Sequence, residues 1–192
     1  MYISPQYTDD DWRKLSFSTE DEWRKAIDIF EDRVRGRFLE PISCINGCTY
    51  AGFAVLALDC LLIETLQQFY EGVSGTPSRQ SKTFFVRFLT ETSFDCYFDK
   101  EMAEKFYKQI RCGILHQAEV EGNSRVLIKG DLVKYTDDRK GLVINRKLFH
   151  KQLVREFEDY VARLREPSNQ ELRKRFRKKM DYICRVSGET GW

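Results

Sequence analysis

The sequence predicts a mainly α-helical bundle that carries a small β insertion. Three observations indicate this fold class. Apolar residues recur at helical spacing in several segments, most of these segments are bounded by helix-capping residues, proline or glycine, and the spacing gives way to short β-prone runs only at about residues 124–145. With 192 residues, the chain is long enough to bury a core without a metal or a disulfide.

The first predicted helix begins at a capping box formed by Thr19 and Glu22 and continues until Pro41. Its apolar positions are Trp23, Ile27, Phe30, Val34 and Phe38. A second helix is predicted from about Thr49 to Glu71, because Gly72 is a typical stop signal. This helix is apolar on most faces, so we expect it to lie centrally, with neighbours covering it all round.

Two further helices are predicted before the β insertion. Thr76 and Pro77 are typical of the N-cap and first turn of a third helix, and Asp99 is typical of the N-cap of a fourth, which reaches about Ala118. The apolar positions of the third helix are Phe84, Phe85, Phe88 and Leu89.

Residues 124–145 predict a hairpin or meander, because short runs of Val, Leu and Ile alternate with turn residues there. Helical spacing then returns and ends before Pro167. Ser168 and Glu171 form a second capping box, which predicts a last helix at about 168–187. We expect one domain over residues 1–192, with a bundle core at 18–165 and this C-terminal helix.

The composition indicates a soluble cytoplasmic protein. The six cysteines lie mostly in apolar surroundings and no signal peptide precedes them, so we expect reduced thiols. Cys44 and Cys48 have no second ligand pair at zinc-binding spacing, so no metal and no cofactor are expected. The apolar stretch from Ala51 to Ile63 is interrupted by Asp59 and is shorter than a membrane span, so no membrane contact is expected.

Charge is asymmetric along the chain although the net charge is only +2. Residues 8–32 carry nine acidic and four basic side chains, whereas residues 163–185 carry nine basic and three acidic ones. Four of these basic residues are candidate RNA contacts on the last helix: Arg173, Lys174, Arg177 and Lys178. A solvated amphipathic face explains the same pattern.

The fourth helix carries the residues with the clearest chemical meaning. Its segment Arg111-Cys-Gly-Ile-Leu-His116 resembles the active-site motif of HEPN-type ribonucleases, in which four to six residues separate Arg and His near the end of a bundle helix. At about 100° per residue, Arg111 and His116 flank the core stripe of this helix on opposite sides. Cys112 and Leu115 lie on a second apolar face between them, with Gly113 nearby.

The resemblance implies a HEPN-like helical domain and a metal-independent endoribonuclease whose site forms at a homodimer interface along the Arg111–His116 helix. In that reading, His116 moves a proton to or from RNA while Arg111 stabilises the charge that develops on the phosphate. Such enzymes occur in toxin–antitoxin and phage-defence systems, so an antitoxin or another protein partner is expected. The rival function is a HEPN-like module that binds RNA or protein without catalysis.

Structural explanations exist for each of these residues. His116 fits a helix-capping role and Arg111 fits a pair with a carboxylate. Glu64 lies in an otherwise apolar helix, where it would orient Arg111 or His116 or pair with another base. Tyr107, one turn before Arg111, fits an RNA contact or a core position. Cys112 departs from many active family members, which place a polar residue directly after the arginine.

Overall fold

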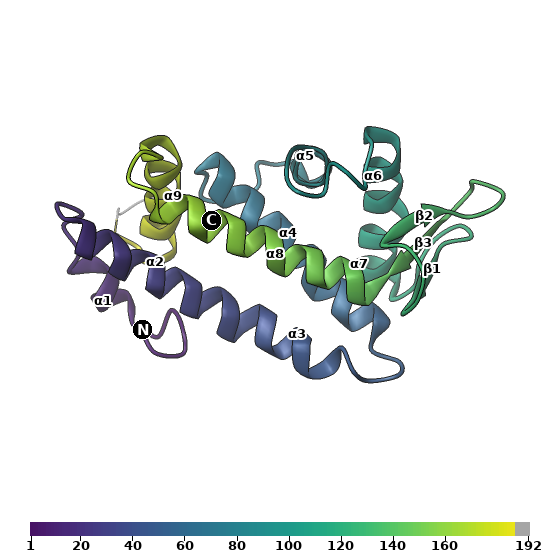
Figure 1. Cartoon of the computed structure of the whole chain (residues 1–192), viewed down its shortest axis with the longest axis horizontal. Helices are drawn as coiled ribbons and strands as arrows, with labels where there is room; N and C mark the ends of the chain where they lie inside the picture. The colour runs from purple at the N-terminus through teal and green to yellow at the C-terminus, as the bar shows by residue number, and fades with distance from the viewer. Residues whose placement is uncertain (187–192) are drawn as a thin grey trace. The chain divides into compact units, whose positions relative to one another are not determined.

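The computed structural model describes residues 1–186 and confirms a mainly helical chain with one small sheet (Figure 1). The α-helices are α1 (Asp9–Arg13), α2 (Glu20–Val34), α3 (Glu40–Ile45), α4 (Gly52–Glu71), α5 (Ser81–Glu91), α6 (Lys100–Phe106), α7 (Gly113–Gln117), α8 (Arg146–Arg165) and α9 (Gln170–Ile183). Two π-helical segments, η1 (Arg35–Leu39) and η2 (Tyr107–Cys112), and three strands, β1 (Arg125–Leu127), β2 (Val133–Tyr135) and β3 (Leu142–Asn145), complete the elements.

The chain divides into two compact units that interleave along the sequence. Unit 1 comprises residues 1–41, 68–75 and 157–192, and unit 2 comprises residues 42–67 and 76–156. The long helices α4 and α8 each contribute residues to both units. Whether residues 1–192 act as one domain stays a prediction.

Unit 1 is built around Phe30 of α2, which is fully buried. Its ring lies 4.6 Å from the ring of Phe69 and 5.3 Å from that of Phe176, measured between centroids. Tyr160 of α8 packs on the same ring at 5.9 Å. Four segments that are far apart in sequence therefore share one aromatic cluster, and α9 is part of this core.

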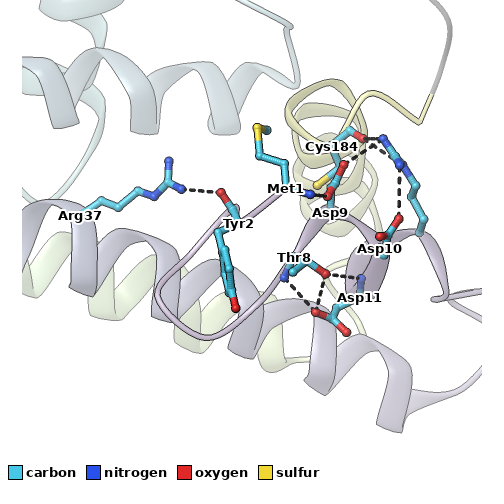
Figure 2. A network of polar contacts seen from close by, with 9 residues as sticks. Met1, Tyr2, Thr8, Asp9, Asp10, Asp11, Arg37 and Cys184 are labelled. Carbon is cyan, nitrogen blue, oxygen red and sulfur yellow. Dashed lines mark hydrogen bonds and ion pairs between the residues drawn. The ribbon is translucent and has the colours of Figure 1, made fainter.

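Polar contacts hold the N-terminal segment in place within unit 1 (Figure 2). The Met1 ammonium pairs with Asp9, and a capping box between Thr8 and Asp11 starts α1. The Arg13 guanidinium donates from Nη2 to the Cys184 carbonyl at 2.8 Å, so α1 is joined to the end of α9.

The prediction that the first helix ends at Pro41 is wrong. α2 passes into η1 and then into α3, which contains Pro41. Proline lacks an N–H, and its ring crowds the carbonyl four residues earlier. In the wider π-helical turn the Glu40 N–H donates to the carbonyl of Arg35, five residues earlier, and we infer that this change of register lets the helix continue through Pro41.

Two predicted helix starts are also wrong. α5 begins at Ser81 and not at Thr76, because Arg79 has a left-handed backbone that breaks any helix there. α9 begins at Gln170 after Asn169, and no side chain caps it, so Ser168 and Glu171 form no capping box. Residue 187, the expected end of this helix, lies outside the described residues.

The core of unit 2 is a second set of aromatic rings. Phe106 of α6 stacks on Phe149 of α8 at 5.0 Å and on Phe85 of α5 at 5.8 Å. Phe94 joins them, 5.2 Å from Phe149. These contacts fix α6, and therefore the start of the segment that carries Arg111, against α5 and α8.

The small sheet has the strand order β1-β3-β2, so it is not a meander, but the consecutive strands β2 and β3 are antiparallel neighbours and form the predicted hairpin. β3 lies in the centre, parallel to β1 and antiparallel to β2. β3 is the most buried strand, with Leu142 and Ile144 fully inside, and a central position gives it partners on both edges. The sheet lies beside α6 and α7 in Figure 1.

Helix α4 is less enclosed than its composition predicts, because Leu61 is 50% exposed and Ala54 is exposed as well. Among the described residues, only this helix is long and apolar enough to cross a membrane, and half of its most apolar window is buried inside the structure. The stretch from Ala51 to Ile63 is shorter than a membrane span, but the helix that contains it is not. A buried core helix of a soluble protein passes the same test of length and composition.

Candidate functional site

Arg111 lies in the π-helical segment η2 and pairs with Glu64 of α4. The Arg111 Nη2 and Glu64 Oε2 atoms are 2.9 Å apart, and the two side chains are 15% and 17% exposed. The structure thus brings together two residues that are 47 positions apart in sequence. π-helical turns are frequent at functional sites because they change which side chains face a given surface.

Tyr107 supports the same guanidinium. Its ring centroid lies 5.4 Å from the Arg111 Cζ atom, within cation–π range. Partial burial acts to lower the pKa of Arg111, but the hydrogen bond and the negative charge of Glu64 raise it above its ordinary value. Arg111 Nε is buried without a hydrogen-bond partner in the described structure. The guanidinium is therefore a fixed cation at the edge of unit 2, with donor capacity left over.

His116 is in a different state from Arg111. It lies in the last turn of α7 and is exposed, and none of residues 1–186 forms a hydrogen bond or ion pair with its side chain. The helix ends one residue later, at Gln117, because Ala118 adopts a left-handed backbone with φ of 54°. The imidazole is thus open to solvent and is not held in a capping role.

Apolar side chains also face solvent on α7 and α4. Leu115 of α7 is 41% exposed and Leu61 of α4, one turn before Glu64, is 50% exposed. Cys112 is partly exposed, whereas Gly113 is buried. A Cβ at Gly113 would lie 2.5 Å from the Glu119 carbonyl oxygen. This glycine therefore packs against the turn that follows α7 and does not add to the exposed face that carries Cys112 and Leu115.

A buried pair of titratable residues, which the sequence does not single out, lies inside unit 2. The His150 Nδ1 atom is 2.8 Å from Asp59 Oδ1, and the two residues are 5% and 0% exposed. Burial raises the pKa of Asp59, against the hydrogen bond from His150. Both residues are polar positions on apolar helix faces, which is the sequence signal, but only the packing of α4 against α8 shows that they meet. His150 is therefore a core residue.

The basic C-terminal helix is used mainly to hold unit 1 together. Arg173 is 4% exposed and donates from Nη1 and Nη2 to both carboxylate oxygens of Glu20, at 2.7 and 2.9 Å. The expectation that Arg173 is exposed to RNA is therefore wrong, because its guanidinium already has a carboxylate partner. Arg177 is exposed but covers the Phe17 ring at 4.2 Å. Lys174 and Lys178 are exposed and have no ion pair within residues 1–186.

Unit 2 also has an open groove of about 440 Å³ between α5 and α6. Charged residues line it, including Lys82, which pairs with Glu104 at 2.9 Å. The groove contains neither Arg111 nor His116. Within residues 1–186, no group of His, Cys, Asp and Glu side chains is arranged to hold a metal ion.

No protein-family model, curated protein or solved structure matches this chain. The resemblance to HEPN ribonucleases therefore rests on the residues around Arg111 and His116.

Proposed function

We propose that this protein is a metal-independent endoribonuclease of the HEPN type that works as a cytoplasmic homodimer. The observation that carries the proposal is the contrast within one helical segment: Arg111 is fixed by Glu64 and Tyr107, while His116 is exposed and unpaired within the described structure. A fixed cation suits phosphate, and an accessible imidazole suits proton transfer.

The reaction we infer uses the RNA as its own nucleophile. The His116 imidazole accepts the proton of a ribose 2′-hydroxyl, the 2′-oxygen attacks the adjacent phosphorus, and the bond from phosphorus to the 5′-oxygen breaks. The leaving 5′-oxygen receives a proton from an imidazolium or from water. Arg111 stabilises the extra negative charge that develops on the phosphate oxygens while the new bond forms and the old one breaks. The products are a 2′,3′-cyclic phosphate and a 5′-hydroxyl end.

Dimerisation would place two such pairs side by side. The exposed Leu115 and the partly exposed Cys112 lie between Arg111 and His116 along the chain, so a second copy that covers these apolar side chains also brings its own Arg111 and His116 close. Lys174 and Lys178 of α9 are exposed and form no ion pair within residues 1–186, so they can attract RNA. We also propose that the protein acts in a toxin–antitoxin or phage-defence system and has a protein partner there.

The test is cleavage of a labelled RNA in EDTA, followed by analysis of the product ends. We expect cleavage of RNA but not of DNA, and a loss on the order of 10²–10⁴ in rate for both His116→Ala and Arg111→Ala. Gln117→Ala and Lys108→Ala are matched controls, because both residues are exposed, lie on the same helical segment, and should leave the rate unchanged. Cleavage that requires Mg²⁺, or that survives His116→Ala, would reject the assignment.

A second candidate is a module that binds RNA or protein without catalysis. The Arg111–Glu64 ion pair favours it, because a guanidinium that is already paired is less free to bind a phosphate. Cys112 directly after Arg111 is the other departure from active family members. This function predicts salt-dependent RNA binding that weakens on reversal of Lys174 and Lys178, with no new RNA ends.

A further inference from the structure

Arg146, the first residue of α8, is a buried cation without a counterion. It is 3% exposed, and its Nη2 donates to the Cys48 carbonyl at 2.6 Å. Its Nε and Nη1 atoms are buried and have no hydrogen-bond partner, and no carboxylate among residues 1–186 pairs with it. A guanidinium stays charged at any physiological pH, and a buried charge without a partner is strongly unfavourable.

The N-terminus of α4 lies against this guanidinium. The Arg146 Nη1 atom is 3.7 Å from the position that a Cβ on Gly52 would take, and Gly52 is the first residue of α4. The first-turn N–H groups of an α-helix have no acceptor within the helix, and the N-terminus carries partial positive charge. The first turn of this 20-residue helix contains no acidic residue. Positive charge from two sources therefore meets at a place where no carboxylate among residues 1–186 pairs with the guanidinium.

The neighbouring N-terminus shows how the chain satisfies such a site with its own atoms. At the start of α8, Asn145 Oδ1 accepts hydrogen bonds from the N–H groups of Lys147 and Leu148, at 3.1 and 3.3 Å. At α4 no side chain of residues 1–186 has this role, and Gly52 itself has no side chain to cover its N–H group. The nearest side chain there is Val126, whose Cγ1 would lie 3.1 Å from a Cβ on Gly52.

We propose that unit 2 binds a phosphate-type oxyanion between Arg146 and the first turn of α4. The Nε and Nη1 atoms of Arg146 and the N–H groups of residues 52–54 are the donors, a combination that suits a tetrahedral oxyanion. The turn at residues 46–51 supplies the Cys48 carbonyl that accepts from Arg146, and because Nε and Nη1 are buried we expect this turn to shift when the anion binds. The anion arrives either free or as the phosphate of a nucleotide.

This site is separate from the proposed catalytic residues. Gly52 and Glu64 are twelve residues apart on α4, which is roughly 18 Å along a helix that rises 1.5 Å per residue. A phosphate at Arg146 is therefore not the phosphate under attack near Arg111.

The experiment is thermal unfolding of the whole chain, titrated with inorganic phosphate, with adenosine monophosphate, or with chloride at equal ionic strength. We expect a saturable rise of the midpoint with phosphate but not with chloride. An equal rise with the nucleotide identifies a bound phosphate group, and a rise with inorganic phosphate alone identifies the free ion. Equal midpoints in phosphate and chloride, with no rise in the nucleotide, would overturn the proposal.

Two variants test whether the rise of the unfolding midpoint comes from phosphate bound at Arg146. Arg146→Gln should weaken phosphate binding by about tenfold or more, because it removes the charged donor. Arg125→Gln is the control, since Arg125 is exposed on β1 and should keep the wild-type response. A wild-type response in folded Arg146→Gln would contradict the assignment.

A second pair of variants does not depend on the folding of Arg146→Gln. Gly52→Asp places a carboxylate beside Arg146, whereas Gly52→Asn has the same shape and the same crowding against Val126 without the charge. We expect Gly52→Asp to have the higher midpoint in phosphate-free buffer and to lose the phosphate response. Equal midpoints for the two variants would reject the site.

Discussion

Arg111 and His116 belong to one motif but are held differently, and this difference is decided by single contacts. Arg111 has a carboxylate, an aromatic ring and partial burial around it, whereas His116 has none of these within the described structure. An arginine held in this way is oriented before any ligand arrives. We therefore assign Glu64 and Tyr107 as positioning residues for Arg111 in both candidate functions.

The pair between Glu64 and Arg111 should be measurable as stability. Glu64→Gln keeps the shape but removes the charge, so we expect a loss of about 1–3 kcal/mol in the free energy of unfolding, as for a partly buried, charge-assisted hydrogen bond. The measurement is urea denaturation of both single variants and of the double variant with Arg111→Met. Additive losses across this cycle would show that the two side chains do not interact.

The capping box of α2 predicts a dependence of stability on pH. Hydrogen bonds from the Ser16 N–H and hydroxyl, and from Ser18, lower the pKa of Glu22 from 4.5 to about 2. Because the pKa is lower in the folded state, the stabilisation is fully present above pH 4.5 and is lost as the pH falls towards 2. The unfolding midpoints of wild type and Glu22→Gln should therefore differ at pH 6 and converge only as the pH falls through about 2. A difference that stays constant over this range would count against the assignment.

At the scale of elements, the two π-helical segments change what helical periodicity implies. η1 carries the helix through Pro41, and η2 places an extra residue in the turn that carries Arg111. The uniform 100° per residue used to place Arg111 and His116 on either side of the core stripe does not hold through η2. The end of the segment is set by contact with the turn that follows, at Gly113 and Ala118.

Two substitutions at this end should have opposite effects. Gly113→Ala places a Cβ 2.5 Å from the Glu119 carbonyl oxygen, so we expect a loss of about 1–3 kcal/mol in stability although alanine is the better helix former. Ala118→Gly relieves a left-handed backbone and should add up to about 1 kcal/mol. Both are measured by urea denaturation, and a stabilising Gly113→Ala would contradict the close packing of this turn.

The proposed dimer face can be tested through Leu115. Leu115→Arg adds charge to a side chain that is 41% exposed, so we expect monomers in place of dimers, by light scattering at micromolar concentration. Leu148→Arg is the matched control, because Leu148 is 40% exposed on α8 and should leave the dimer intact. If the wild-type protein is monomeric under these conditions, the proposal of an active site shared between two copies is wrong.

At the scale of the whole molecule, unit 1 is formed by segments from both ends of the chain and from the middle. Phe176 of α9 shows the consequence, because its ring contacts Trp12 at 5.8 Å and Phe30 at 5.3 Å. The helix with the most basic exposed face is therefore also structural, and variants of it must be checked for folding before RNA binding is interpreted.

Phe176→Ala should destabilise unit 1 by about 3–5 kcal/mol, the range for truncating a buried phenylalanine. Phe176→Leu keeps more of the volume and should cost less. Tryptophan fluorescence in a urea titration reports on this change, because Trp12 and Trp23 both lie in unit 1. If Phe176→Ala unfolds at the same urea concentration as wild type, α9 is not part of the core.

The sequence by itself determined the helical class, the position of the β insertion and several boundaries, such as the capped starts of α2 and α6 and the end of α4. These features depend on local properties: side-chain spacing, capping hydrogen bonds and turn residues. The sequence also singled out Arg111, His116 and Glu64 as residue types with chemical potential.

Only the tertiary structure decided which of these residues meet. Three contacts join positions 47 or more apart in sequence: the Arg111–Glu64 pair, the buried Asp59–His150 pair and the hydrogen bond from Arg146 to the Cys48 carbonyl. Spacing along one helix carries no information about such contacts. Only the structure likewise showed that Arg173 is buried in unit 1, paired with Glu20. The sequence of an amphipathic helix does not indicate whether a basic side chain faces a distant carboxylate or solvent.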